Sequence, residues 1–306
     1  MNPRKALVVA VIVGLFVAGS GFTAGATTYG VFSDADTGTG SIQAAASFDV
    51  PGDGPCVDTN GNGECNPGDA PVDPDELRTF DNASADLVIP ASVGDISTKK
   101  ADISITANTI TSEVDLTTKN AEIDLNAGTG GIDLAGTNLT RNGGNGAITL
   151  HSAGPVTLSN AGVSTKGTVA VSADAGLDLD GITIDTNKEI TLRARTISAH
   201  NAVLTSKTRD IVLGATRMGG GALTASGAAI TVEGGNGQVT LESVGNMSLD
   251  EATITTANRQ PTANLTSSEA ILDVTATEIL GKYTTIAYTP ANVTIEPPDS
   301  ESVVGQ

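Results

Sequence analysis

Residues 58–69 carry side-chain oxygens at nearly every second position, in a stretch dominated by Asn, Asp and Gly. Hard cations such as Ca²⁺ take about six to eight oxygen ligands, and alternate residues of a curling loop turn their oxygens inward. Gly63 falls where a twelve-residue calcium loop makes its sharp turn. The spacing predicts a structural Ca²⁺ site, and the alternative is a turn without a metal. The predicted ligands are Asp58, Asn60, Asn62, Glu64 (through its backbone carbonyl), Asn66 and Asp69.

The last predicted ligand is Asp69 rather than the bidentate Glu of an EF-hand, and no helical pattern flanks the loop. The loop resembles a thrombospondin type 3 repeat, whose D-x-D-x-D-G-x-x-D-x-x-D spacing is met here with Asn at three of the Asp positions. The resemblance implies a calcium-binding segment outside the cell. Because few carboxylates would bind the ion, we expect an affinity in the weak, extracellular range.

Cys56 and Cys65 are the only cysteines of the chain, and they bracket the first part of this loop. In an exported protein a single pair nine residues apart suggests a local disulfide. Two free thiols or a pair of metal ligands are the alternatives. We interpret residues 51–80, which contain few apolar side chains, as a clasp between an amino-terminal strand and the domain that follows.

The amino terminus has the layout of a secretory signal. Arg4 and Lys5 precede an apolar run at residues 6–18, and Ala24-Gly25-Ala26 is a candidate cleavage site. We expect residues 1–26 to be removed and the protein to be secreted or held at the extracellular cell surface. Residues 6–26 are also long enough to span a bilayer, so a retained membrane anchor stays open.

Residues 28–40 resemble the start of the TasA/camelysin family of secreted biofilm fibre subunits. The Phe32-Ser33-Asp34 core matches the family's phrase, whereas Gly30-Val31 departs from it. The resemblance covers only about residues 1–50, and the family's jelly-roll sandwich does not fit the rest of this chain. It implies that residues 41–50, within a segment at 27–50, could add as a strand to a neighbouring subunit; pairing within the same chain is the alternative.

An aliphatic-x-aliphatic phrase returns after residue 100 at steps of 20, 25, 21, 21, 21 and 19 residues. Aliphatic and polar residues alternate within each phrase, as in a strand with one buried face, and further short apolar pairs follow before the next phrase. Three short strands in a period of about 21 residues predict one coil of a right-handed parallel β-helix over residues 81–288. An antiparallel sandwich is the rival. The phrases start at Ile103, Ile123, Ile148, Val169, Ile190, Ile211 and Ile230.

The composition restricts the partners. A net charge of −19 makes nucleic acid unfavourable and is typical of halophilic proteins that stay soluble in concentrated salt. No aromatic residue lies between Phe80 and Tyr283, so the repeat region lacks the rings on which sugars or bases stack.

Candidate catalytic groups on the outer faces are Asp178, Asp180 and Asp185, with Arg193 and Arg195 one coil later. The same alternation of carboxylate and aliphatic recurs on other coils, which favours a solvated acidic surface. His151 and His200 fall at different phases of the repeat, so we assign no catalytic residue. Five glycosylation motifs start at Asn82, Asn138, Asn246, Asn264 and Asn292.

These features favour a structural β-helix protein acting in adhesion, a surface layer or extracellular assembly, and residues 289–306 read as a disordered tail. The repeat region is similar to adhesin-type solenoids such as filamentous haemagglutinin. A polysaccharide lyase or glycoside hydrolase is the enzymatic alternative, and a polymerising bactofilin-like scaffold is the second structural one. Expected partners are the chain itself, other surface proteins or glycans, with membrane contact only through an uncleaved amino-terminal segment.

Overall fold

The computed structural model describes residues 54–217, 221–235, 237–249 and 251–256, and the backbone of five strands between residues 263 and 295. The chain divides into two units, Met1–Ser47 and Phe48–Gln306, and every described residue belongs to the second. The predicted signal and the predicted strand at residues 41–50 therefore lie outside the described residues. Among the described residues, no helix is long and apolar enough to cross a membrane.

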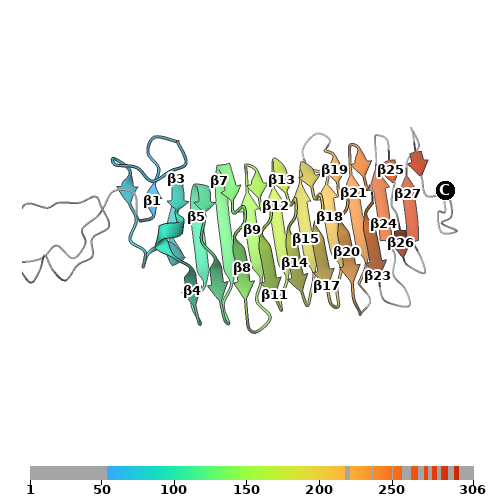
Figure 1. Cartoon of the computed structure of the whole chain (residues 1–306), viewed down its shortest axis with the longest axis horizontal. Coiled ribbons are helices and arrows are strands. Elements are labelled where there is room, and N and C mark those ends of the chain that lie inside the picture. Colours follow the sequence, from blue (N-terminus) through green and yellow to red (C-terminus); the bar gives the residue numbers. More distant parts are fainter. Residues whose placement is uncertain are drawn as a thin grey trace, which may run out of the picture. The chain divides into compact units, whose positions relative to one another are not determined.

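The described residues form a parallel β-helix, as the period predicts (Figure 1). Strands of successive coils pair in parallel about 22 residues apart. The first strands of the coils are β3 (Asp81–Ile89), β5 (Ile103–Ser112), β7 (Ile123–Asp133), β9 (Ile148–Ser152), β12 (Val169–Ala173), β15 (Ile190–Ala194), β18 (Ile211–Ala215), β21 (Val239–Ser243), β24 (Ala263–Ser267) and β27 (Thr284–Tyr288).

The second strands of the later coils continue the same 19-stranded sheet around a corner, whereas β5 and β7 bend through that corner without a break. They are β10 (Val156–Thr157), β13 (Gly176–Asp178), β16 (Thr196–Ser198), β19 (Leu223–Thr224), β22 (Met247–Ser248), β25 (Leu272–Val274) and β28 (Val293–Ile295).

The third strands form a separate nine-stranded sheet. They are β4 (Ile96–Thr98), β6 (Leu116–Thr118), β8 (Asn138–Arg141), β11 (Gly162–Thr165), β14 (Thr183–Thr186), β17 (Val203–Ser206), β20 (Ala229–Val232), β23 (Thr253–Thr256) and β26 (Glu278–Leu280).

Six of the seven predicted phrases stack in one ladder, from Ile103 through Ile211. The seventh prediction is wrong. Ile230 lies in β20 on the other sheet, between Leu204 and Ile254, and Val239 takes the place above Ile211. The sequence misled because the coil that starts at Ile211 is longer. The aliphatic pair of its third strand, Ile230 and Val232, therefore falls where the next first strand was expected.

The core is a column of aliphatic side chains with exposures near zero, because the alternation places every second residue inside. Buried hydroxyls replace aliphatics at the end of the third strand. Thr118 Oγ1 donates to the Ala121 carbonyl at 2.8 Å, and Ser206 Oγ donates to the Arg209 carbonyl at 2.7 Å. A carbonyl removed from water needs a hydrogen-bond donor, and these hydroxyls supply it. We call the stacked hydroxyls at the ends of the third strands the hydroxyl ladder; they let the chain turn tightly after each third strand without leaving buried carbonyls unpaired.

Arg141 interrupts the hydroxyl ladder on the rung between Thr118 and Thr165. It is buried, and its Nε donates to the Ala121 carbonyl at 2.6 Å. Six residues separate Arg141 from Ile148, whereas three separate Thr165 from Val169. A Cβ on Gly146 would lie 2.5 Å from Nε, so the longer turn wraps closely around the guanidinium. The longer turn accounts for most of the extra residues in the 25-residue step from Ile123 to Ile148.

The strand pairing also extends beyond the predicted end of the β-helix at residue 288. Strand β28 (Val293–Ile295) pairs in parallel with β25, inside the stretch that the sequence assigns to a tail at 289–306. Alternating Val293 and Ile295 carry the same period-two signal as the earlier strands, so the tail boundary was placed too early.

Candidate functional site

The predicted clasp at residues 51–80 is part of the solenoid's amino-terminal cap. Strand β1 (Cys56–Val57) pairs antiparallel with β3, where Cys56 faces Val88 and Val57 faces Leu87. Strand β2 (Ala70–Pro71) pairs antiparallel with β1 in turn. An exposed strand edge is a template for pairing with other chains, and β1 covers the outer edge of β3.

Two short 3-10 helices, η1 (Leu77–Thr79) and η2 (Ala91–Val93), complete this end. Leu77 is fully buried and belongs to the same apolar cluster as the aliphatic column. Phe80, the residue after η1, also packs against that cluster. An apolar plug keeps water from the first rung, as capping repeats of solenoids must.

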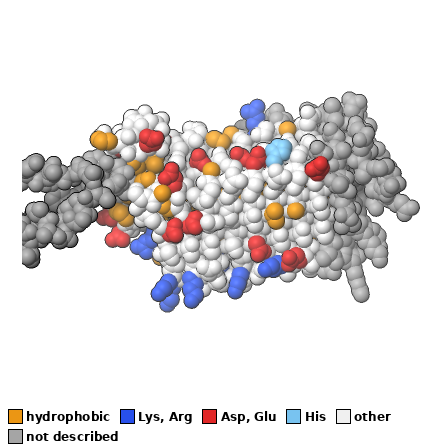
Figure 2. All heavy atoms as spheres, in the orientation of Figure 1, with side chains coloured by type: hydrophobic (Ala, Val, Ile, Leu, Met, Phe, Trp, Pro, Cys, Tyr) orange, Lys and Arg blue, Asp and Glu red, His pale blue; other side chains and the backbone are white. Residues whose placement is uncertain are grey.

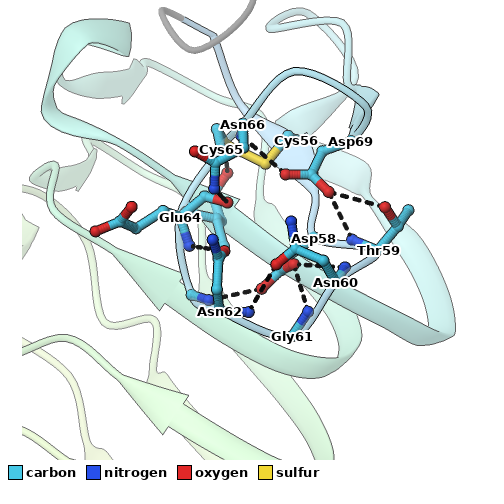
Figure 3. Close-up of a disulfide and its surroundings, with 12 residues drawn as sticks. Cys56, Asp58, Thr59, Asn60, Gly61, Asn62, Glu64, Cys65, Asn66 and Asp69 are labelled. Carbon is cyan, nitrogen blue, oxygen red and sulfur yellow. Dashed lines mark hydrogen bonds between the residues drawn. A yellow bond between two sulfur atoms is a disulfide. The ribbon is translucent and has the colours of Figure 1, made fainter.

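Asp58 organises the predicted calcium loop (Figure 3). It is only 6% exposed, and its Oδ1 accepts the backbone N–H groups of Asn60 at 3.0 Å and Gly61 at 2.7 Å. Its Oδ2 accepts the N–H of Gly63 at 2.7 Å. Asn60 Oδ1 accepts the N–H of Asn62 at 3.1 Å, which repeats the same local turn. Short polar side chains that bind the backbone two residues on stabilise such turns.

Asp69 closes the loop from its other end. Its Oδ1 accepts the N–H of Thr59 at 2.9 Å and the Thr59 hydroxyl at 2.8 Å, and its Oδ2 accepts the N–H of Asn66 at 2.8 Å. The Thr59 amide first, then the Asn66 amide and the Thr59 hydroxyl, lower the pKa of Asp69 below the ordinary aspartate value. The carboxylate therefore stays ionised in mildly acidic solution.

The predicted disulfide between Cys56 and Cys65 is present, with Cα atoms 5.7 Å apart. It joins strand β1, which lies between β2 and β3, to the middle of the loop. The Asp58 N–H also donates to the Asp86 carbonyl of β3 at 2.7 Å. The loop is thus fastened to the first rung by a covalent bond and by backbone hydrogen bonds.

The oxygens of the predicted Ca²⁺ ligands mostly accept hydrogen bonds from the loop itself. An ionised carboxylate offers about four lone-pair sites, and Asp58 and Asp69 each use three of them on N–H or O–H donors. Asn62 Oδ1 accepts the N–H of Glu64, and Figure 3 shows the Glu64 side chain pointing away from Asp58. No cluster of three or more His, Cys, Asp or Glu side chains suited to a metal occurs among the described residues. In this arrangement the loop satisfies its own polar groups, and an ion would have to draw the Asn oxygens away from the amides.

The candidate catalytic carboxylates do not converge. Asp178 and Asp180 line an open groove of about 430 Å³ across the second strands, together with Ser198 and Thr224. Asp180 Oδ1 already accepts the Ser198 hydroxyl at 2.7 Å and the N–H of His200 at 2.9 Å. Asp185 lies on the other sheet in β14, where its Oδ2 is 3.8 Å from Lys207 Nζ.

The candidate bases lie apart from this groove. Arg193, in β15, is exposed as predicted, and its Nη1 lies 3.9 Å from Glu242 Oε2. His151 stacks on Ser172 in the first-strand ladder, whereas His200 follows β16. The groove therefore brings together two carboxylates and several hydroxyls, without a histidine or arginine side chain in its lining.

Three glycosylation motifs fall on described side chains. Asn82, Asn138 and Asn246 are all exposed. The Asn138 amide nitrogen donates to both carboxylate oxygens of Asp115, at 3.1 and 2.9 Å, so this nitrogen is engaged. Asn264 and Asn292 have no described side chain.

Comparison with known proteins gives no relative. No protein family, no curated protein and no solved structure matches this chain.

Proposed function

We propose that this chain is a secreted or cell-surface structural protein, in which a parallel β-helix acts as a rigid extracellular scaffold. One observation carries the proposal: the described strands bury an unbroken aliphatic column, while the candidate catalytic groups on the outer faces are dispersed over two sheets. Side chains placed this way contribute to rigidity and surface chemistry rather than to a reaction centre.

The proposed location draws on two independent features. A disulfide persists in oxidising compartments and is rare in the cytosol of mesophiles, and the cap contains one between Cys56 and Cys65. The Arg4-Lys5 start and the apolar run at residues 6–18 have the layout of an export signal. A scaffold outside the cell also fits the acidic surface, since a net charge of −19 favours solubility.

The loop at residues 58–69 is proposed to bind Ca²⁺ weakly, as a structural ion of the cap. Its Asp and Asn oxygens have the spacing that calcium loops use, and Asp58 and Asp69 each keep one free lone-pair site. The ion would add to a cap that the disulfide and the Asp58 hydrogen bonds already hold.

Protease treatment of intact cells tests the location. Cells expressing the full chain should lose it to an added protease, whereas a Leu15→Asp, Val17→Asp variant with a broken apolar run should be protected inside. Electron microscopy of cells with and without the protein then tests the scaffold role. A protected full chain, or surfaces that look and adhere alike, would contradict the proposal.

A further inference from the structure

Every lysine among the described residues lies at one corner of the solenoid, in the turn that follows the third strand of a coil. Figure 2 shows most of the blue side chains along the lower edge. Five of these lysines are exposed and Lys188 is half-buried. We call this set the lysine corner; its members are Lys99, Lys100, Lys119, Lys166, Lys188 and Lys207.

The backbone register places four of these lysines on one line along the solenoid axis. The N–H of Lys119 donates to the Thr98 carbonyl, so Lys119 lies directly on Lys99 of the previous coil. Lys166 and Lys207 continue this line, with Asn142 and Asn187 on the rungs between. Neighbouring rungs are about 4.8 Å apart, so Lys119, Lys166 and Lys207 follow one another at roughly twice that spacing along the axis.

The ammonium groups are largely unpaired, although the chain holds 35 acidic residues against 16 basic ones. Over the described residues, the one ion pair formed by a lysine joins Lys207 Nζ to Asp185 at 3.8 Å. Carboxylates at the end of the same turns bind backbone instead. Asp102 accepts the N–H of Glu122 at 2.8 Å, and Asp210 accepts the N–H of Gln238 at 2.9 Å.

Lys99 and Lys119 are like charges on adjacent rungs and repel one another, which costs stability in the isolated chain. An anion lying along the corner would remove this repulsion and gain several charge-assisted contacts at once. The partner has to be linear, because the lysines form a line one or two residues wide, and carboxylates flank it both in the same turns, as at Asp102 and Asp210, and on other faces of the solenoid.

The surface beside the lysine corner indicates which polyanion fits. The outward positions of the third strands next to it carry hydroxyls on every rung but one, where Asp185 pairs with Lys207. The hydroxyls belong to Ser97, Thr117, Thr140, Ser164 and Thr205. Val203 is the sole exposed large hydrophobic side chain among the described residues, so there is little to insert into a lipid surface. Hydroxyls beside ammonium groups match a partner that carries both hydroxyls and carboxylates.

We propose that the lysine corner binds a linear acidic polysaccharide, which lies along the solenoid axis with its carboxylates on the ammonium groups. The hydroxyl row would hydrogen-bond the sugar hydroxyls beside them. The choice of a glycan rests on the proposed location outside the cell, whereas the charge pattern does not depend on it. The scaffold would thereby attach to a carboxylated extracellular matrix.

Binding of purified full-length chain to alginate oligomers tests the proposal, with a neutral glucan, phosphatidylglycerol vesicles and duplex DNA as the other probes. The test variant is Lys119→Glu, Lys166→Glu. The matched control is Arg78→Glu, Arg195→Glu, which changes the net charge equally at exposed positions outside the corner. Thermal melts should confirm that both variants fold.

The corner variant should lose on the order of tenfold in alginate affinity at about 0.1 M salt, and the control less than about twofold. Raising the salt to about 1 M should weaken wild-type binding, because the Debye length falls from roughly 10 Å to roughly 3 Å. Equal losses in the two variants, no binding to alginate, or tighter binding to vesicles or DNA would each overturn the proposal. A chain found inside the cell would refute the proposed function without altering these binding results.

Discussion

Asn160 and Gly181 occupy the same turn position in consecutive coils, and Asn160 Oδ1 lies 2.5 Å from where a Cβ on Gly181 would be. Both residues have positive φ, 56° for Asn160 and 69° for Gly181. Asn201 and Gly227 repeat the relationship at 2.4 Å two coils on. From Gly136 to Glu251 every coil has a left-handed residue at this turn. Because a side chain on one coil takes the space of the next, glycine alternates with a residue that carries a side chain.

Gly181→Ala should destabilise the protein by about 1–2 kcal/mol, because alanine in a left-handed conformation is strained and its Cβ meets the Asn160 amide. Thermal or urea melts measure the loss. In an Asn160→Gly background the contact is gone, so the same substitution should cost less. An equal cost in both backgrounds would show that the two side-chain positions do not interact.

Leu77→Ala should destabilise the protein by roughly 2–4 kcal/mol, since Leu77 is fully buried at the end of the aliphatic column. Hydrogen exchange should reveal faster opening of β3 and β5, with β15 and β18 little changed, because each coil contacts mainly its neighbours. The exposed neighbour Arg78 gives a control, and Arg78→Ala should change stability by less than about 0.5 kcal/mol. Uniformly faster exchange would argue against a local plug.

Asp58→Ala should lower the melting temperature even in a chelator, because three backbone N–H groups lose their acceptor. If the loop binds Ca²⁺, the loss should be larger with calcium present than with chelator. Asp58→Asn is the matched control. Its side chain keeps one acceptor oxygen, and its amide N–H₂ replaces the other oxygen and faces a backbone N–H donor. An unchanged wild-type melting temperature with calcium and with chelator would refute the calcium site.

Replacing both cysteines, as Cys56→Ala, Cys65→Ala, should cost roughly 2–3 kcal/mol, the loop-closure contribution of a short disulfide. The loss should concentrate in the cap, so limited proteolysis ought to cut residues 58–69 first. Reducing the wild type should have the same effect, and reducing the double variant should have none. Intact loops after reduction would mean that the hydrogen bonds of Asp58 and Asp69 suffice.

Acid should loosen the cap before the solenoid. The pKa of Asp69 is lowered in the folded chain, so its contribution is present above the pKa of an unfolded aspartate, about 4, and is lost as pH falls through the folded value. Loop cleavage by an acid-stable protease should therefore rise below about pH 4. Asp69→Asn should already be cleaved at neutral pH and show little further change; a wild-type pattern in that variant would rule out this role.

The period of the aliphatic phrase was sufficient to predict the parallel stack and the ladder from Ile103 to Ile211. It failed at Ile230, because the pattern cannot tell which of three strands an aliphatic pair belongs to once a coil lengthens. Cys56 and Cys65 were paired correctly from their spacing. The antiparallel direction of β1 was missed, since two residues carry no signal of strand direction.

The sequence by itself determined the coil, because a solenoid repeats one local rule, aliphatic inside and polar outside, at every rung. Only the tertiary structure decided which residues meet across coils. It placed Asp185 on a different sheet from Asp178, wrapped a long turn around Arg141, and aligned Lys119 with Lys99. These relationships depend on the lengths of the intervening turns, which differ from coil to coil, so the spacing along the sequence alone does not give the side chains that stack.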